Sequence, residues 1–66
     1  MKLILNGEEK TFNDPVSVTD LLADLGLADK RVAVEVNLEI VPRSKHGQFT
    51  LKEADRVEVV KAIGGG

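Results

Sequence analysis

The chain has 66 residues with 11 acidic and 9 basic side chains, and a net charge of −2. It contains no cysteine, one histidine and two phenylalanines. A chain this short forms one small domain, which buries only about 60% of the surface of its unfolded form. The lack of cysteine excludes disulfides and cysteine-based metal sites, and one histidine is too few for a typical transition-metal site. The core must therefore consist of aliphatic side chains, and we expect no metal site.

The charge pattern and the hydropathy also exclude two classes of partner. Basic and acidic residues are mixed along the chain, without the basic stripe and the aromatic side chains that nucleic-acid binding proteins usually present. No apolar run approaches the roughly 20 residues of a membrane span, and no signal-peptide pattern opens the chain. We therefore expect a cytoplasmic protein with neither a nucleic acid nor a membrane as partner.

The first elements are predicted to be a β-hairpin. Residues 1–6 are typical of a strand, with Leu3 and Leu5 on one face. Asn6 and Gly7 follow, and both tolerate the positive φ angles that a type I′ hairpin turn requires. Residues 8–12 are then predicted to form the second strand.

A helix is predicted after this hairpin. Ser17 is a favourable N-cap, and Asp20, three residues later, can complete a capping box. Gly26 is a natural residue for the position after the helix. The apolar residues fall at the spacing of one helix face, namely Val18, Leu21, Leu22 and Leu25.

Strands dominate the second half. Residues 31–36 and 56–61 each alternate like a strand, and residues 40–41 could form a short one before Pro42. The polar residues 43–48, including His46, are predicted to form a loop. One helix must cover one face of the sheet, and the last strand could pair beside the first at its centre. The expected class is α+β, with one main helix on a mixed sheet of four to five strands.

The chain ends in Ile63 followed by three glycines, Gly64, Gly65 and Gly66. Three glycines fix no backbone conformation, so they contribute little to a fold. Such a segment is thin enough to enter a narrow active-site channel, and its carboxylate has no β-carbon beside it. The alternative is a frayed terminus or a remnant of an expression vector. We expect a folded domain over residues 1–62 and a flexible tail over residues 63–66.

An exposed apolar strip is expected next to this tail. Val60 and Ala62 should point away from the face that holds Val57 and Val59. Together with Ile63, they could form a surface on which a partner enzyme docks, because a single helix leaves one sheet face bare. The alternative is that these are ordinary exposed apolar residues.

Several segments in this order resemble the ThiS family within the β-grasp, or ubiquitin-like, superfamily. The resemblance extends over the whole length and includes the Asn6-Gly7 opening and the glycine ending. The segments that carry it are Leu3 to Gly7, Val18 to Leu22, Val34 to Asn37, Ile40 to Pro42, Leu51 to Val60, and Ala62 to Gly66. This resemblance implies a β-grasp fold and a sulfur carrier protein of thiamine biosynthesis.

In that family, an E1-like enzyme uses ATP to adenylate the terminal glycine, a persulfide donor converts the adenylate to a thiocarboxylate, and thiazole synthase takes the sulfur. The resemblance thus implies that Gly66 carries the sulfur and that Gly64 and Gly65 enter the partner's active site. The chain has no phosphate-binding Gly-x-x-x-x-Gly-Lys-[Ser/Thr] loop, so ATP and magnesium should belong to the partner. We expect a carrier and substrate with no stably bound cofactor, rather than an enzyme.

Two other functions remain open. One is the small subunit of a molybdopterin synthase, or a carrier for another sulfur pathway, with the same fold and the same Gly-Gly ending. The other, from a different class, is a non-covalent β-grasp interaction module whose glycines are incidental. A sulfur carrier requires a free carboxylate at Gly66, whereas an interaction module tolerates an addition there.

Overall fold

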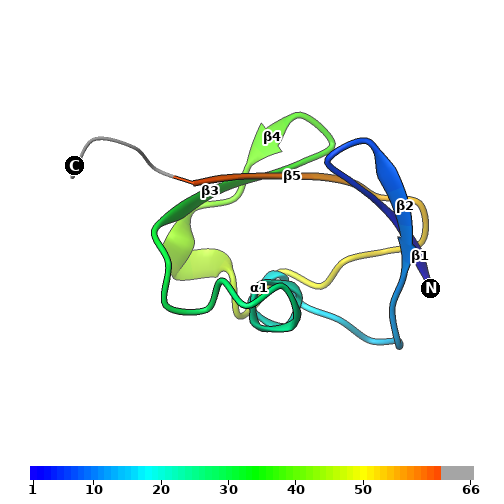
Figure 1. Cartoon of the computed structure of the whole chain (residues 1–66), viewed down its shortest axis with the longest axis horizontal. Helices are drawn as coiled ribbons and strands as arrows, with labels where there is room; N and C mark the ends of the chain where they lie inside the picture. The colour runs from blue at the N-terminus through cyan, green and yellow to red at the C-terminus, as the bar shows by residue number, and fades with distance from the viewer. Residues whose placement is uncertain (62–66) are drawn as a thin grey trace.

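A computed structural model describes residues 1–61 (Figure 1). Within this range the chain forms five strands, one α-helix and one 3₁₀ turn. In chain order these are β1 (Lys2–Leu5), β2 (Glu8–Thr11), α1 (Val18–Asp24), β3 (Val32–Val36), β4 (Glu39–Ile40), η1 (Arg43–Lys45) and β5 (Arg56–Lys61). Figure 1 shows two layers, with the sheet on one side and α1 below it.

The five strands form one mixed sheet in the order β2-β1-β5-β3-β4. The last strand, β5, is parallel to β1 on one side and antiparallel to β3 on the other. Both hairpins, β1–β2 and β3–β4, are antiparallel and place β2 and β4 at the sheet edges. The predicted α+β class, the mixed sheet and the central place of the last strand are confirmed.

The first hairpin closes through the turn that the sequence predicts. Leu5 pairs with Glu8, so the connection has two residues, Asn6 and Gly7. Their φ angles are 48° and 85°, as a type I′ turn requires. This turn has the right-handed twist of the flanking strands, so it directs β2 back along β1.

The helix has the expected caps at both ends. The Asp20 amide donates to Ser17 Oγ at 3.1 Å, and the Ser17 amide donates to Asp20 Oδ2 at 3.0 Å. These reciprocal bonds form the predicted capping box. After the helix, Gly26 has a φ of 74°, the left-handed conformation that glycine adopts without strain.

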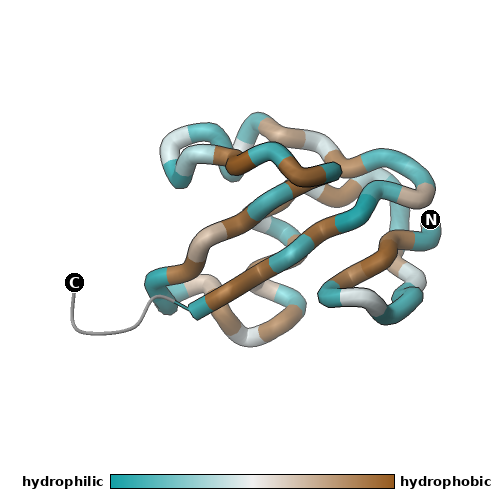
Figure 2. Tube along the Cα trace, turned by 90° about the horizontal axis from the view of Figure 1, so that it is seen from above, coloured by the Kyte–Doolittle hydropathy of each residue, from teal (hydrophilic) through white to brown (hydrophobic). Residues whose placement is uncertain are grey.

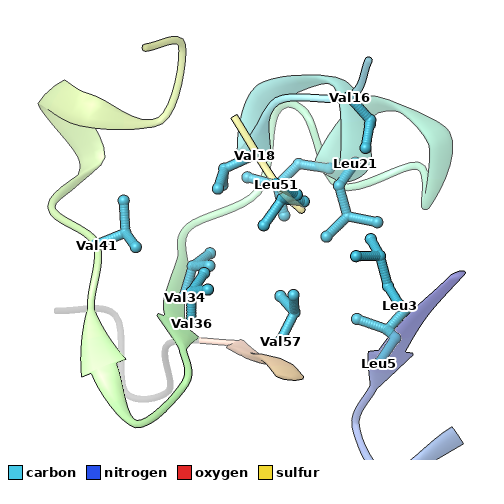
Figure 3. Packing of buried hydrophobic residues seen from close by; sticks show 11 residues of the cluster. Leu3, Leu5, Val16, Val18, Leu21, Val34, Val36, Val41, Leu51 and Val57 are labelled. Atoms are coloured by element: carbon cyan, nitrogen blue, oxygen red, sulfur yellow. The ribbon is translucent and has the colours of Figure 1, made fainter. Parts of the chain in front are cut away.

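The core lies between α1 and one face of the sheet (Figure 3). We call this covered face the inner face and the opposite one the outer face. The buried aliphatic side chains are Leu3, Leu5, Val16, Val18, Leu21, Leu22, Val34, Val36, Val41, Leu51 and Val57. Leu25 packs against this cluster from its margin. All four residues of the predicted helix face therefore contact the core.

The short fourth strand is displaced by one residue from its predicted position. It comprises Glu39–Ile40 rather than residues 40–41. Val41 lies directly after the strand and is buried, and its amide donates to the Val34 carbonyl oxygen at 2.9 Å. Val41 is therefore the residue of this segment that packs in the core, whereas Ile40 is exposed on the edge strand.

His46 is not the plain loop residue that the sequence suggested. The segment after Pro42 forms the turn η1, and His46 directly follows it with only 7% of its surface exposed. Its Nε2 lies 3.0 Å from the Val41 carbonyl oxygen and therefore carries the hydrogen. The His46 carbonyl oxygen also accepts from the Thr19 amide at 3.2 Å. The imidazole thus links η1 to the segment after β4, and its backbone links η1 to α1.

Candidate functional site

The strand β5 leads directly to residues 62–66, so its surroundings define the candidate site. It pairs with β3 over five residue pairs, from Val36↔Val57 to Val32↔Lys61. On its other side it pairs with β1 only at Arg56 and Val57. The half of β5 next to the glycine segment thus has a strand neighbour on one side only.

A single side chain continues the pairing where β1 ends. The chain turns away at Asn6, whose carboxamide then meets the β5 backbone at Val59. The Val59 amide donates to Asn6 Oδ1 at 2.9 Å, and Asn6 Nδ2 donates to the Val59 carbonyl oxygen at 3.4 Å. Asn6 therefore both permits the hairpin turn and satisfies two backbone groups of the strand that bears the tail.

A second asparagine holds the beginning of β5. The Arg56 amide donates to Asn37 Oδ1 at 3.0 Å, and the Asn37 amide donates to the Arg56 carbonyl oxygen at 2.7 Å. Asn37 Nδ2 also donates to Asp55 Oδ1 at 3.0 Å. The side chains of Asn37 and Asn6, from two different hairpin turns, thus hold β5 at its beginning and at Val59.

The outer face carries the remaining side chains of the strands. Because side chains alternate along a strand, each residue between two buried ones points to the outer face. Figure 2, seen from the sheet side, shows hydrophobic and hydrophilic positions alternating along the strands. The outer face comprises Lys2, Ile4, Glu9, Thr11, Ala33, Glu35, Ile40, Arg56, Glu58 and Val60. Within residues 1–61, no helix covers this face (Figure 1).

Of the predicted docking residues, the structure describes Val60. It lies on the outer face opposite Ala33, and 59% of its surface is exposed. Its orientation away from the core is as expected, and its docking role stays a prediction. Ala62 and Ile63, together with Gly64, Gly65 and Gly66, lie outside the described residues.

Three features of this part of the molecule were missed by sequence reasoning, and the sequence holds a signal for two of them. Asn6 was interpreted only as a turn residue, and Asn37 only as the end of a segment of the family resemblance, although an asparagine beside a strand end can also bond the next strand. Glu35 and Glu58 face each other across β3 and β5, which only the register reveals. Leu38, which is 85% exposed in a turn, breaks the rule that such positions are polar or glycine.

Other kinds of site find no support in residues 1–61. No group of three histidine or acidic side chains in this range lies close enough together to hold a metal ion. None of the helices in the described part of the chain has the length and hydropathy needed to cross a membrane.

The fold and the exposed face define a small β-grasp domain that presents its central last strand beside an uncovered sheet face. The ThiS family model matches residues 3–66. The chain is 38% identical over 65 residues to the sulfur carrier protein ThiS of Bacillus subtilis, covering 97% of this chain and 98% of the relative. It is also similar to the crystal structure of the thiamine biosynthesis protein ThiS from Geobacter metallireducens, with 36% identity, full coverage of both chains and a TM-score of 0.85.

The chain therefore belongs to the ThiS family. Its β-grasp fold, expected from the sequence resemblance, is confirmed by the Geobacter structure. It is also 48% identical over 66 residues to a thiazole synthase of Paramagnetospirillum magneticum. The match covers 100% of this chain and 20% of that relative, so the chain spans about a fifth of the relative's length.

Proposed function

We propose that this protein is a sulfur carrier of thiamine biosynthesis and that the carboxylate of Gly66 carries the sulfur. The observation that carries the proposal is the match to the ThiS family, which includes the glycine segment. The geometry of the described residues supports it, because the central strand β5 is fixed by its neighbours and leads into that segment. The family match also favours this function over that of a molybdopterin-synthase small subunit.

The proposed chemistry begins with activation of the carboxylate. A carboxylate is ionised at pH 7 and is a poor acyl electrophile, since a nucleophile would have to expel an oxide. An oxygen of Gly66 attacks the α-phosphorus of ATP and pyrophosphate leaves, which gives an acyl-adenylate. ATP and magnesium bind to an E1-like partner, whose site must offset the negative charge of the transition state. This chain is a substrate and carrier in the step, and not its catalyst.

Sulfur then replaces the adenylate. The terminal sulfur of a persulfide attacks the Gly66 carbonyl carbon, and AMP leaves. A thiol of the donor system cleaves the resulting acyl disulfide, so that a disulfide and the thiocarboxylate are produced. The chain has no cysteine, so both sulfur-bearing groups come from partners.

Thiazole synthase is the proposed acceptor of this sulfur. A segment similar to the whole chain occurs within the thiazole synthase of Paramagnetospirillum magneticum. The joining of such a segment to that enzyme in one polypeptide supports a partnership between the two activities. Gly64 and Gly65 are proposed to enter the partner's channel, because a β-carbon there would widen the segment and restrict φ.

The experiment incubates the 66-residue chain with its cognate adenylating enzyme, ATP, magnesium and a persulfide donor. Pyrophosphate release and intact mass are measured, and we expect the mass change that replaces one oxygen by sulfur. Deletion of Gly66, or its extension by one residue, should abolish both signals. Each change displaces the reacting carbonyl by about 3.3 Å, whereas reacting atoms must lie about 3–3.5 Å apart.

Gly47→Ala is the matched control. A β-carbon at Gly47 would lie 3.7 Å from Thr19 Oγ1, an ordinary contact, so this variant should keep wild-type pyrophosphate release. If the extended chain forms adenylate at the wild-type rate, Gly66 is not the functional group. The non-covalent interaction module would then be the better description.

A further inference from the structure

A hollow lies where α1, the segment after it and η1 meet beside the start of β3 (Figure 1). Its volume is about 160 Å³. It is lined by the polar residues Thr19, Lys30, Arg43 and His46, beside aliphatic residues that include Leu22 and Val32. One water occupies about 30 Å³ in the liquid, so the hollow accepts an ion of about five heavy atoms. It is too small to enclose a nucleotide.

The hollow carries positive charge, although the chain as a whole has a net charge of −2. Lys30 and Arg43 contribute two cationic side chains, and no aspartate or glutamate of the described part of the chain lines the hollow. The ion pair found within residues 1–61 joins Lys2 and Glu9, so neither cation has a carboxylate oxygen within 4 Å in this range. Cations that line one hollow without a counter-ion favour a bound anion.

His46 adds a largely buried nitrogen to this hollow. Its Nε2 donates to the Val41 carbonyl oxygen at 3.0 Å, so the neutral ring leaves Nδ1 as a hydrogen-bond acceptor. Nδ1 has no hydrogen-bond partner among residues 1–61, and no side-chain nitrogen or oxygen sealed from solvent in this range lacks one. Nδ1 must therefore be open to solvent. Because His46 is only 7% exposed and lines the hollow, we infer that Nδ1 meets solvent there.

Thr19 supplies a hydroxyl group next to this imidazole. A β-carbon at Gly47 would lie 3.7 Å from Thr19 Oγ1, so this oxygen lies close to the backbone that follows His46. The Thr19 amide also donates to the His46 carbonyl oxygen at 3.2 Å, which holds the two residues together. The hollow thus combines several hydrogen-bond donors with one acceptor, Nδ1.

We propose that this hollow binds inorganic phosphate as the hydrogen phosphate ion. Lys30, Arg43 and the Thr19 hydroxyl donate to the phosphate oxygens, and the P–O–H group of the ion donates to His46 Nδ1. Hydrogen bonds from charged donors to an anion are stronger than neutral ones, so the two cations supply affinity. The acceptor supplies specificity, because a dianion without a proton would place an oxygen against the Nδ1 lone pair. The site goes beyond the proposed function and does not depend on the sulfur chemistry.

The experiment titrates the 66-residue chain at pH 7.5 and constant ionic strength with three dianions, namely inorganic phosphate, sulfate and methyl phosphate. A phosphate monoester is largely without a proton at this pH, and sulfate has none, so only inorganic phosphate donates a hydrogen bond. The Kd for sulfate and for methyl phosphate should be at least about tenfold higher than for phosphate, because Nδ1 is then left without a partner.

Nuclear magnetic resonance locates the bound ion. With phosphate, saturable shifts are expected for the amide signals of Thr19, Lys30, Arg43 and His46. The ¹⁵N signal of His46 Nδ1 should move upfield, as expected for an imidazole nitrogen that begins to accept a hydrogen bond, whereas Nε2 should keep its hydrogen. This measurement tests the role of His46 without a substitution, since the loss of a buried ring would also affect folding.

Thermal unfolding gives a second measure of the same affinity. Phosphate at about ten times its Kd should raise the melting temperature by about 5–10 °C, because it binds the folded chain and not the unfolded one. Sulfate stabilises proteins through the same general exclusion from their surface as phosphate does. The difference between the two salts therefore isolates the contribution of the site.

Two double variants test the cations. Lys30→Gln/Arg43→Gln removes two exposed charges from the hollow and should raise the Kd for phosphate about tenfold or more. Lys10→Gln/Lys52→Gln is the matched control, because it removes two exposed lysines that do not line the hollow. At physiological ionic strength its Kd should stay within about twofold of the wild-type value.

The outcomes decide the inference without ATP, a persulfide or a partner enzyme, so they are independent of the proposed function. Shifts that do not saturate, or an unchanged Kd in Lys30→Gln/Arg43→Gln, would show that phosphate does not bind in the hollow. Equal affinity for the three dianions, or a His46 ring that takes up a proton at Nδ1 on binding, would overturn the recognition of hydrogen phosphate.

Discussion

The two faces of the sheet differ in what they contribute to the protein. The inner face supplies Leu3, Leu5, Val34, Val36 and Val57, all buried beneath α1. The outer face alternates with it along the same strands but exposes Ile40 and Val60, and pairs Glu35 with Glu58. The inner-face residues stabilise the fold, because the burial of each one removes apolar surface from water. The outer-face set contains features that folding alone disfavours.

This contrast shows where function can be sought on this domain. A small domain has little stability to spare, so strain and like-charge contacts are not expected at random positions. Here Leu38 and the Glu35–Glu58 pair lie on or beside the uncovered face, whereas Ala54, which also has a positive φ, lies in the turn before β5. Local disagreement with folding rules is expected at functional sites, so the outer face is where a functional surface should be sought.

The largest effect is expected from truncation of the inner layer. Leu21 has no exposed surface and lies in the centre of the helix face that contacts the sheet. Leu21→Ala should reduce the free energy of unfolding by about 2–5 kcal/mol, through lost burial and the cavity that remains. For a domain of this size that is a large fraction of the total stability. Urea denaturation followed by circular dichroism measures the effect, and a midpoint close to wild type would mean that α1 does not support the core.

The sequence predicted the inner layer well because its signals are local. The helix phase of Val18, Leu21 and Leu22, the capping box at Ser17 and the turn at Asn6-Gly7 each depend on residues a few positions apart. His46 was interpreted wrongly because its burial depends on α1 and the segment around Val41, which are brought together only by the fold. The same holds for Glu35 and Glu58, since 22 residues separate them and no periodicity within either strand reveals their pairing.

An intermediate effect is expected from loss of the helix cap. Ser17→Ala removes the oxygen that accepts from the Asp20 amide at 3.1 Å and should reduce stability by about 1 kcal/mol. Ser17→Asp is the matched control, because aspartate is an equally good N-cap and should retain most of the stability. Thermal unfolding of both variants measures the difference. Equal losses in the two would show that the cap is not what anchors α1 over the inner face.

A smaller effect is expected from the carboxamide that links the hairpin to β5. Asn6→Gly keeps a residue that tolerates positive φ but removes both bonds to Val59, and should reduce stability by about 0.5–1 kcal/mol. Amide hydrogen exchange should become faster at Val59 by a larger factor than at Val41, whose amide bond to the Val34 carbonyl oxygen is not touched by the substitution. Asn6→Ala loses the bonds and is also strained at a φ of 48°, so it should be less stable than Asn6→Gly. If Asn6→Ala is instead more stable than Asn6→Gly, the positive φ at position 6 does not strain an alanine.

The smallest effect on folding is expected on the outer face itself. Ile40 is as large as Leu21, but 72% of its surface is exposed on the edge strand β4, where it faces Glu35. Ile40→Ala removes side-chain atoms that are already in water, so the free energy of unfolding should change by less than about 0.5 kcal/mol. Leu21→Ala and Ile40→Ala thus shorten aliphatic side chains on opposite sides of the sheet, and urea denaturation of the two gives the contrast directly. If Ile40→Ala destabilises the free chain as strongly as Leu21→Ala, the outer face belongs to the core and the distinction between the two faces is wrong.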